Sequence, residues 1–202
     1  HSEYSLLDGA FRVKEIVAAA KEMGMPAVAL TDHGNLFGTI PFYNEAVAAG
    51  IRPIIGMETY VAQRKMTDRS REGGLGRNDH LVLLVKNERG YRNLIELSSL
   101  AFLEGFYYKP RIDLDTLERF SEGLVALSGC IQGSIPRLLR AGKTEEARAL
   151  AARFASIFAP GDFYLEIQNH GIREELETIP LLTALAAETG LPLVATNDCH
   201  YR

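Results

Sequence analysis

The sequence predicts an α/β fold, a distorted seven-stranded (β/α)7 TIM-like barrel. Short apolar runs alternate along the 202 residues with segments whose apolar residues recur at helical spacing. Strands separated by helices of about 10–15 residues are typical of parallel βαβ units. Six apolar runs qualify as strands, and we expect a seventh, a truncated first strand, just upstream of His1. A closed or nearly closed barrel is therefore favoured over a small open sheet.

The first half of the chain contains three of the predicted strands. A helix is predicted over 12–23 because apolar residues recur at every third or fourth position. Gly24 and Pro26 end this helix before a strand over 27–30. The elements predicted next are a helix over 42–49, strands over 53–61 and 80–85, and a helix over 93–102.

The second half continues the alternation of helix and strand. Helices are predicted over 114–120, 134–140, 145–158 and 174–189, and strands over 124–127, 163–167 and 191–195. Thr144 is predicted to cap the third of these helices, because a threonine oxygen can accept a free backbone N–H of the first turn. A polar loop over 63–79 is the one candidate insertion, so residues 1–202 are predicted to form a single domain.

Composition excludes several classes of protein. The chain is 47% hydrophobic and 24% charged, which is ordinary for a globular protein. Its net charge of −4 argues against a simple duplex-DNA clamp, which is usually basic. No apolar stretch approaches the roughly 20 residues that cross a bilayer, so no membrane partner is expected. Two cysteines do not suggest a disulfide framework, and we expect a reducing, cytoplasmic location.

Four of the predicted strands end in residues that bind metals. The polar groups that follow them are His33, Glu58, Cys130, and Asp198 with His200. Carboxyl ends of barrel strands gather catalytic groups at one rim, so these side chains are expected to converge. Asp198 and His200 are two apart and would share a face of an extended strand, with Cys199 pointing away. A multinuclear metal site is the leading hypothesis.

Each of these residues also has an ordinary interpretation. His33 could make a loop hydrogen bond, and Glu58 could be buried beside an arginine instead of a metal. Cys130 could be a small buried hydrophobe. His80 precedes its apolar run, so the preceding loop would have to carry it to the rim.

Three further groups are candidates. His1 and Asp8 lie in the opening segment, where a histidine that ends the first strand would face the same rim. His170 follows another strand and is expected to support the ligands or to bind substrate. In the 63–79 loop, Arg64 and Arg77 could hold phosphates, although charge runs are usually solvated surface. Clustered metals suit phosphoryl chemistry, in which one ion activates water and another steadies the leaving oxygen.

Four segments, over 1–9, 31–36, 105–111 and 196–201, resemble the polymerase-and-histidinol-phosphatase (PHP) domain family. The Gly-Phe-Tyr-Tyr-Lys-Pro-Arg stretch at 105–111 resembles the branch attached to bacterial replicative DNA polymerases, not the phosphatase branch. The resemblance implies a seven-stranded barrel with up to three divalent ions, zinc or manganese. His1 matches the second histidine of the family's opening His-x-His motif, and the first would lie upstream. The ligands implied are His1, Asp8, His33, Glu58, His80, Cys130, Asp198 and His200.

The resemblance also implies a function and partners. The expected activity is 3′–5′ exonuclease proofreading on the 3′ end of a DNA primer, with Asp198, His33 and His200 as the residues that carry catalysis. Expected partners are the remaining polymerase domains of the same chain and other replicase subunits. Two alternatives stay open: a metal-stabilised module that braces the polymerase or docks a separate exonuclease, and a small-molecule phosphatase of the histidinol-phosphate type.

Overall fold

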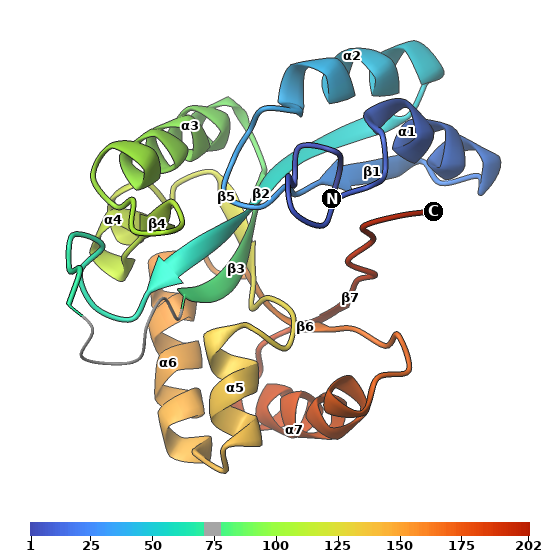
Figure 1. Cartoon of the computed structure of the whole chain (residues 1–202). Helices are drawn as coiled ribbons and strands as arrows, with labels where there is room; N and C mark the ends of the chain where they lie inside the picture. Colours follow the sequence, from blue (N-terminus) through green and yellow to red (C-terminus); the bar gives the residue numbers. More distant parts are fainter. Residues whose placement is uncertain (71–77) are drawn as a thin grey trace.

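The computed structural model of the chain describes residues 1–70 and 78–202. A curled sheet in the order β1-β2-β3-β5-β6-β7, with β4 beside β2, is flanked by helices (Figure 1). The strands are β1 (Ala27–Leu30), β2 (Arg52–Ala62), β3 (Asn78–Val85), β4 (Arg111–Ile112), β5 (Leu124–Leu127), β6 (Phe163–Ile167) and β7 (Leu193–Ala195). The helices are α1 (Val13–Glu22), α2 (Thr39–Ala49), α3 (Glu88–Leu103), α4 (Leu114–Arg119), α5 (Ser134–Arg140), α6 (Thr144–Ile157) and α7 (Arg173–Thr189).

The sheet is mixed, and this corrects the expectation of parallel strands throughout. β1 pairs with β2, β5 with β6 and β6 with β7 in parallel, whereas β3 runs antiparallel to both β2 and β5. A parallel pair needs a long crossover, usually a helix, but an antiparallel pair needs only a loop. The predicted polar loop after β2 supplies no crossover helix in its described part, so β3 returns alongside β2. The two-residue strand β4 was missed because it is too short to show a period.

Most predicted helices are confirmed, with shifted starts. α2 begins at Thr39, with Pro41 in its first turn, and α3 begins at Glu88, where the Asn87 side chain accepts a hydrogen bond from Gly90 N at 3.0 Å. The predicted Thr144 cap is wrong. Thr144 is the first helical residue of α6, and Lys143 stands before it without a side-chain cap. Only Ala141, Gly142 and Lys143 separate α5 from α6, and none of these three residues has a hydroxyl that could cap the helix.

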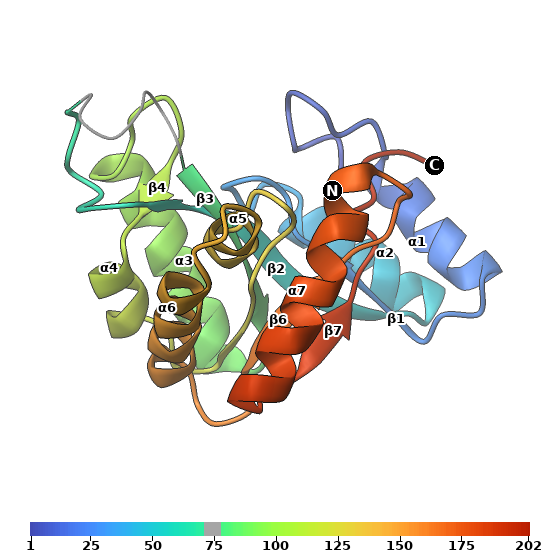
Figure 2. The same cartoon turned by 90° about the horizontal axis from the view of Figure 1, so that it is seen from below.

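Two apolar clusters hold the helices on the sheet. The larger joins β2, β3, β5 and β6 to helices α3 to α7, and its fully buried members include Leu83, Leu94 and Phe154. The smaller packs α1 and α2 together against β1 around Phe42. Figure 2 shows α7 lying along β6 and β7 on the side opposite α3 and α4. Among the described helices, none is both long and apolar enough to cross a bilayer.

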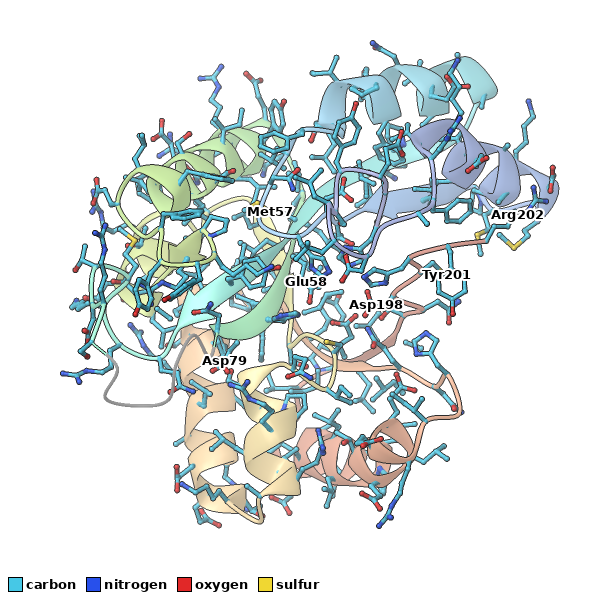
Figure 3. The ribbon with its side chains drawn as sticks, in the orientation of Figure 1. Met57, Glu58, Asp79, Asp198, Tyr201 and Arg202 are labelled. Atoms are coloured by element: carbon cyan, nitrogen blue, oxygen red, sulfur yellow. The ribbon has the colours of Figure 1, made fainter. Side chains whose placement is uncertain are left out.

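Successive side chains of β2 point alternately into the apolar core and toward the candidate site. Met57 points into the larger apolar cluster, and its neighbour Glu58 points to the opposite face, toward the centre of the molecule where Asp198 also lies (Figure 3). The two ends of the described chain meet near this centre, because Ala10 N donates a hydrogen bond to His200 O at 2.8 Å. The fold therefore gathers the opening segment, the middle of β2 and the segment after β7 in one place.

Candidate metal centre

A buried carboxylate ties the opening segment to the end of β1. Asp32 accepts hydrogen bonds from Ser2 N at 2.6 Å, from Ser2 Oγ at 2.8 Å and from Ser5 Oγ at 2.8 Å. The Ser5 oxygen in turn accepts from His33 N at 3.2 Å and lies 3.1 Å from His1 Nδ1. Sequence reasoning did not single out Asp32 or Ser5. The two serines of the opening segment and the Asp-His pair at 32–33 were the sequence features that could have indicated this hydrogen-bond network.

This network assigns the tautomer of His1. The Ser5 hydroxyl has one proton, which it donates to Asp32, so His1 must donate from Nδ1 to the Ser5 oxygen. The other ring nitrogen, Nε2, faces two carboxylates, Glu58 Oε2 at 3.1 Å and Asp198 Oδ1 at 3.0 Å. A nitrogen lone pair and two carboxylates repel one another, so a proton or a metal cation must lie between His1 Nε2 and these oxygens. Burial by itself lowers the pKa of His1, yet contacts with Asp198 and Glu58 raise this pKa to about 10.

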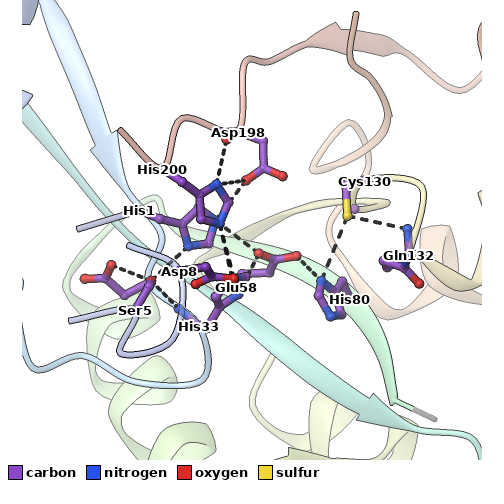
Figure 4. Close-up of polar contacts among 12 residues, drawn as sticks. His1, Ser5, Asp8, His33, Glu58, His80, Cys130, Gln132, Asp198 and His200 are labelled. Carbon is purple, nitrogen blue, oxygen red and sulfur yellow. Dashed lines mark hydrogen bonds and ion pairs between the residues drawn. The ribbon is translucent and has the colours of Figure 1, made fainter. Parts of the chain in front are cut away.

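Glu58 is the centre of the cluster. Its carboxylate is 2% exposed and contacts three imidazoles: His1, His33 and His80, the last with Nδ1 at 2.5 Å from Oε1 (Figure 4). Burial alone would raise the pKa of Glu58, but contacts with the three histidines hold it well below its usual value. Glu58 Oε2 and His33 Nδ1 are both buried and lie 3.0 Å apart, and neither makes a hydrogen bond of regular geometry in the described part of the chain. Buried ligand atoms that face each other without a hydrogen bond fit a divalent cation.

His33 and His200 face each other through ring nitrogens. His33 forms a parallel bridge with Glu58 at the end of β1. His200 Nδ1 lies 2.9 Å from Asp198 O, and because a carbonyl oxygen can only accept, this nitrogen carries the proton. His200 Nε2 is therefore a lone-pair donor, 3.3 Å from His33 Nε2. Asp8 Oδ2 lies 3.4 Å from His33 Nε2, and its half-exposed carboxylate marks the open side of the cluster.

The expected route by which Asp198 and His200 converge was wrong, although both reach the cluster. β7 ends at Ala195, and the residues after it are not a strand. Asp198 has φ 37°, a left-handed conformation that is uncommon outside glycine. This turn, and not alternation along an extended strand, brings the Asp198 carboxylate to His1 and sets His200 against His33.

His80 reaches the rim because β3 is reversed. The expectation that a loop carries His80 to the site is wrong, since the residue lies inside β3, opposite Tyr60 in β2. In an antiparallel strand the amino end lies beside the carboxyl ends of its neighbours. Cys130 Sγ lies 3.9 Å from His80 Nδ1 and accepts a hydrogen bond from Gln132 N at 3.4 Å. Burial and the charge of Glu58 raise the pKa of the Cys130 thiol to about 12.

Three groups of side chains could each hold one ion. Within each group the ligand atoms lie within 4.8 Å of one another, and Glu58 and the imidazoles of His1 and His33 are shared between groups. Shared ligands are what a multinuclear site requires. Asp8 and Cys130 stand at the edges of this set. The groups are His1, His33 and His200; His33, Glu58 and His80; and His1, Glu58 and Asp198.

Two of the three residues predicted to bind substrate, His170 and Arg64, lie outside this cluster. His170 Nδ1 lies 2.7 Å from Glu175 Oε1, and Nε2 lies 2.7 Å from Asn197 O, so both ring nitrogens are engaged with acceptors. The contact with Glu175 is the main cause that raises the pKa of His170. Arg64 is exposed and pairs with Asp68 at 3.3 Å. Arg77 lies outside the described residues.

The model of the PHP domain family matches residues 1–170, most of the chain. The chain belongs to the PHP domain family. This PHP domain is similar to the DNA polymerase III subunit alpha of Borreliella burgdorferi, with 50% identity over 201 residues, and of Treponema pallidum, with 49% over 202 residues. The subunit from Thermus aquaticus is 47% identical over 205 residues. Each alignment covers 100% of this chain and 17% of the relative, so the chain spans about one sixth of their length.

Solved structures support the fold of this PHP domain. An amidohydrolase from Chromobacterium violaceum superimposes with a TM-score of 0.59 at 15% identity, over 98% of this chain and 85% of that one. A structure named for a metal-dependent phosphoesterase from Bifidobacterium adolescentis gives a TM-score of 0.55 at 16% identity, over 96% and 84%. The curled mixed sheet and these neighbours confirm the predicted distorted TIM-like barrel.

Proposed function

We propose that this PHP domain is a metal-dependent phosphodiesterase that removes nucleotides from the 3′ end of DNA. One observation carries the proposal. Six potential ligands from the opening segment, the loop after β1, strands β2 and β3 and the segment after β7 form overlapping groups around the buried Glu58 carboxylate. The similarity to a metal-dependent phosphoesterase supports the reaction class, and the relatives named DNA polymerase III subunit alpha support a DNA substrate.

The residues present fit divalent ions. His200 Nε2 carries a lone pair by the assignment above, and His1 Nε2 faces two carboxylates, where a metal cation can replace its proton. Glu58 Oε2 and His33 Nδ1 lie 3.0 Å apart, buried and without a hydrogen bond of regular geometry in the described part of the chain. Mixed imidazole, carboxylate and thiol ligands suit zinc or manganese, and we propose up to three ions. Such ions would lower the pKa of a bound water and stabilise negative charge on a phosphodiester.

The protein's own groups have distinct tasks. Asp32 and Ser5 orient the imidazole of His1, as hydrogen-bonded carboxylates commonly do for metal-binding histidines. Asp198 and His200 border the side of the cluster on which Asp8 is exposed, and with His33 they are the proposed catalytic groups. Tyr60 packs against both His33 and His80, and burial raises its pKa to about 12, so its hydroxyl stays protonated at neutral pH.

The wider setting follows from the polymerase relatives. We propose that this PHP domain is the amino-terminal part of a bacterial replicative polymerase that works in DNA replication in the cytoplasm. Its partners would be the other polymerase domains of the same chain, further replicase subunits and the primer 3′ end. His170, Arg64 and Arg77 remain proposed substrate contacts. Nucleotide addition itself would belong to residues outside this domain.

A structural role is the second candidate, and one observation favours it. Exposed apolar side chains gather at the start of α2 and the end of α3, where Phe102 lies 6.2 Å from both Phe37 and Phe106, centroid to centroid. A contiguous apolar surface of this kind marks a protein interface. Under this alternative the metals stabilise a domain that braces the polymerase or docks a separate exonuclease. A small-molecule phosphatase is disfavoured by the polymerase relatives.

One experiment separates these functions. The protein, extended upstream of His1 and loaded with Mn²⁺ or Zn²⁺, is incubated with a 5′-labelled single-stranded oligonucleotide and, separately, with a small phosphomonoester. We expect the oligonucleotide to shorten from its 3′ end, and Asp198→Asn and His33→Ala to abolish the shortening. A metal-loaded protein that cleaves neither substrate would favour the structural role. Turnover of the monoester alone would favour the phosphatase.

A further inference from the structure

A tight turn beside the candidate metal centre holds an exposed tyrosine ring and a partly exposed lysine. Residues 106–109 lie in the connection between α3 and β4, and Tyr107 and Lys109 form an isolated antiparallel bridge with Tyr108 at the tip. Tyr108 has φ 59° and is 66% exposed. Among the described residues, the only other non-glycine residue with positive φ is Asp198, which lies in the centre itself. Strained backbone of this kind is concentrated at functional sites.

The turn is held in contact with the residues of the centre. β4 pairs with β2 so that Arg111 stands beside Tyr60, and Tyr60 packs against His80 at 5.2 Å and His33 at 6.1 Å between ring centroids. Pro110 leaves no space for a side chain at Gly34, since a Cβ there would lie 2.8 Å from its Cγ. The turn therefore abuts both the β2 wall of the centre and the loop that carries His33.

Arg111 makes the turn rigid. This buried guanidinium donates to the carbonyl oxygens of Gly105 at 3.0 Å, Met66 at 2.7 Å and Asp68 at 3.0 Å. The Arg111 Cζ atom also lies 5.2 Å from the centre of the Tyr107 ring. Tyr107 in turn packs edge-on against Tyr108, with 4.6 Å between ring centroids. A rigid, solvent-facing ring loses little conformational entropy when a flat partner stacks on it.

Lys109, the residue after Tyr108, adds a cation to the turn. Its Nζ lies 5.1 Å from the centre of the Tyr60 ring, and in the described part of the chain it forms no ion pair. A turn that combines an exposed aromatic face with a cation free of carboxylates matches what single-stranded nucleic acid offers, a base and a phosphate. The apolar surface around Phe37 and Phe102 reaches the turn only at Phe106.

From this arrangement we propose that Tyr108 and Lys109 form a binding subsite for single-stranded DNA next to the metal centre. The Tyr108 ring stacks on a base near the 3′ terminus, and the Lys109 ammonium contacts a backbone phosphate. The subsite makes the centre selective for nucleic acid over small phosphate esters. This inference rests on the proposed function, because it names the part of the same site that recognises the substrate.

The test measures how the full-length protein and its variants cleave two oligonucleotides. One has normal 3′-terminal nucleotides, and the other carries abasic residues at its last three positions, so that phosphates are kept and bases removed. Tyr108→Ala should lower kcat/KM on the normal strand by at least about 5-fold, the lower bound for the loss of one base stack, and leave the abasic strand unchanged. Tyr108→Phe should stay near wild type. Lys109→Gln should weaken the binding of both oligonucleotides and make that binding less dependent on salt concentration.

Tyr43→Ala is the matched control, because Tyr43 is also an exposed tyrosine but lies on α2. It should behave as wild type on both strands. Equal loss in Tyr43→Ala, or wild-type cleavage of the normal strand by Tyr108→Ala, would overturn the subsite and leave the exonuclease in place. If Tyr108→Ala cleaved the normal strand like wild type, the exposed Tyr108 ring would instead be assigned to a contact with another protein.

A second readout does not depend on cleavage. An oligonucleotide with 5-iododeoxyuridine at its 3′ end and a phosphorothioate terminal linkage is irradiated with the protein, and the crosslinked peptide is identified by mass spectrometry. We expect the crosslink at Tyr108. A Tyr108 crosslink in a protein that does not cleave DNA would support the subsite while the exonuclease proposal fails. Crosslinks confined to other residues would overturn the subsite.

Discussion

His200 and His33 place their Nε2 atoms 3.3 Å apart, although 167 residues separate them along the chain. His200 holds its proton on Nδ1, so its Nε2 lone pair points at another ring nitrogen. Two nitrogens at this distance need a proton or a metal ion between them. The contact is therefore most stable when a cation is bound.

Replacement of His200 should remove metal from the protein. We expect His200→Ala to lower the bound metal by at least one ion per chain and to reduce phosphodiesterase activity by about 10- to 100-fold or more. His170→Ala is the comparison, because both nitrogens of His170 already face acceptors. It should keep the full metal content. Inductively coupled plasma mass spectrometry on both variants measures the difference, and equal metal in His200→Ala and wild type would contradict the ligand assignment.

Removal of metal should destabilise the fold. The candidate ligands come from the opening segment, the loop after β1, strands β2 and β3 and the segment after β7, so a cation links parts of the chain that are distant in sequence. An ion that binds only the folded state adds about 2.7 kcal/mol when present at 100 times its Kd. We expect EDTA to lower Tm and added Zn²⁺ or Mn²⁺ to restore it. A Tm that does not respond to either treatment would contradict a metal centre in this protein.

Without metal, the stability of the protein should fall on both sides of a maximum. Contacts with histidines hold the pKa of Glu58 below its usual value of 4.5, so its contribution is present above pH 4.5 and is lost as pH falls further. The pKa of His1 is raised from 6.5 to about 10, so its contribution is present below pH 6.5 and is lost as pH rises toward 10. Denaturation in EDTA from pH 3 to pH 10 measures this profile. Glu58→Gln should flatten both arms, and a profile unchanged by this substitution would contradict the assignment.

Asp113 should stabilise the protein far more than its neighbour Asp115. The buried Asp113 carboxylate caps α4 through Thr116 N at 2.9 Å and also accepts from Met66 N at 3.0 Å. Asp115 is exposed on the same helix. We expect Asp113→Ala to cost about 1–3 kcal/mol of unfolding free energy, from a lost cap and an unsatisfied N–H, and Asp115→Ala to change it by less than about 0.5 kcal/mol. Urea denaturation of both variants at neutral pH checks this, and similar losses would refute it.

Gly90→Ala should be destabilising, against helix propensity. Alanine within a helix is favoured over glycine by about 1 kcal/mol, so helix propensity alone predicts a gain once Gly90 is known to lie in α3. In the structure, a Cβ at residue 90 would lie 1.8 Å from Gly123 O, because α3 crosses the start of β5 at very close range. We expect a net loss of about 1–3 kcal/mol, as for overpacked sites. Thermal denaturation measures it, and a rise in Tm would show that the helix can shift away.

Local pattern was sufficient to predict most of the elements. Helices with strong periodicity, such as α1 and α7, appear within one or two residues of their predicted bounds. β4 has only two residues, and a segment that short carries no period to read. The direction of β3 was also beyond local pattern, because strand direction depends on whether the preceding connection can return along the sheet.

The sequence by itself determined which residue types stand at strand ends, and through them the candidate ligand set. Tertiary structure decided how those residues meet. β3 had to run antiparallel before His80 could lie beside Glu58, and a left-handed turn at Asp198 had to form before His200 could face His33. It also decided which ring nitrogen carries a proton, in His1 through Asp32 and Ser5 and in His200 through the Asp198 carbonyl. Local propensities fix neither strand direction nor partners distant in the chain, because both come from contacts that exist only after the sheet has curled.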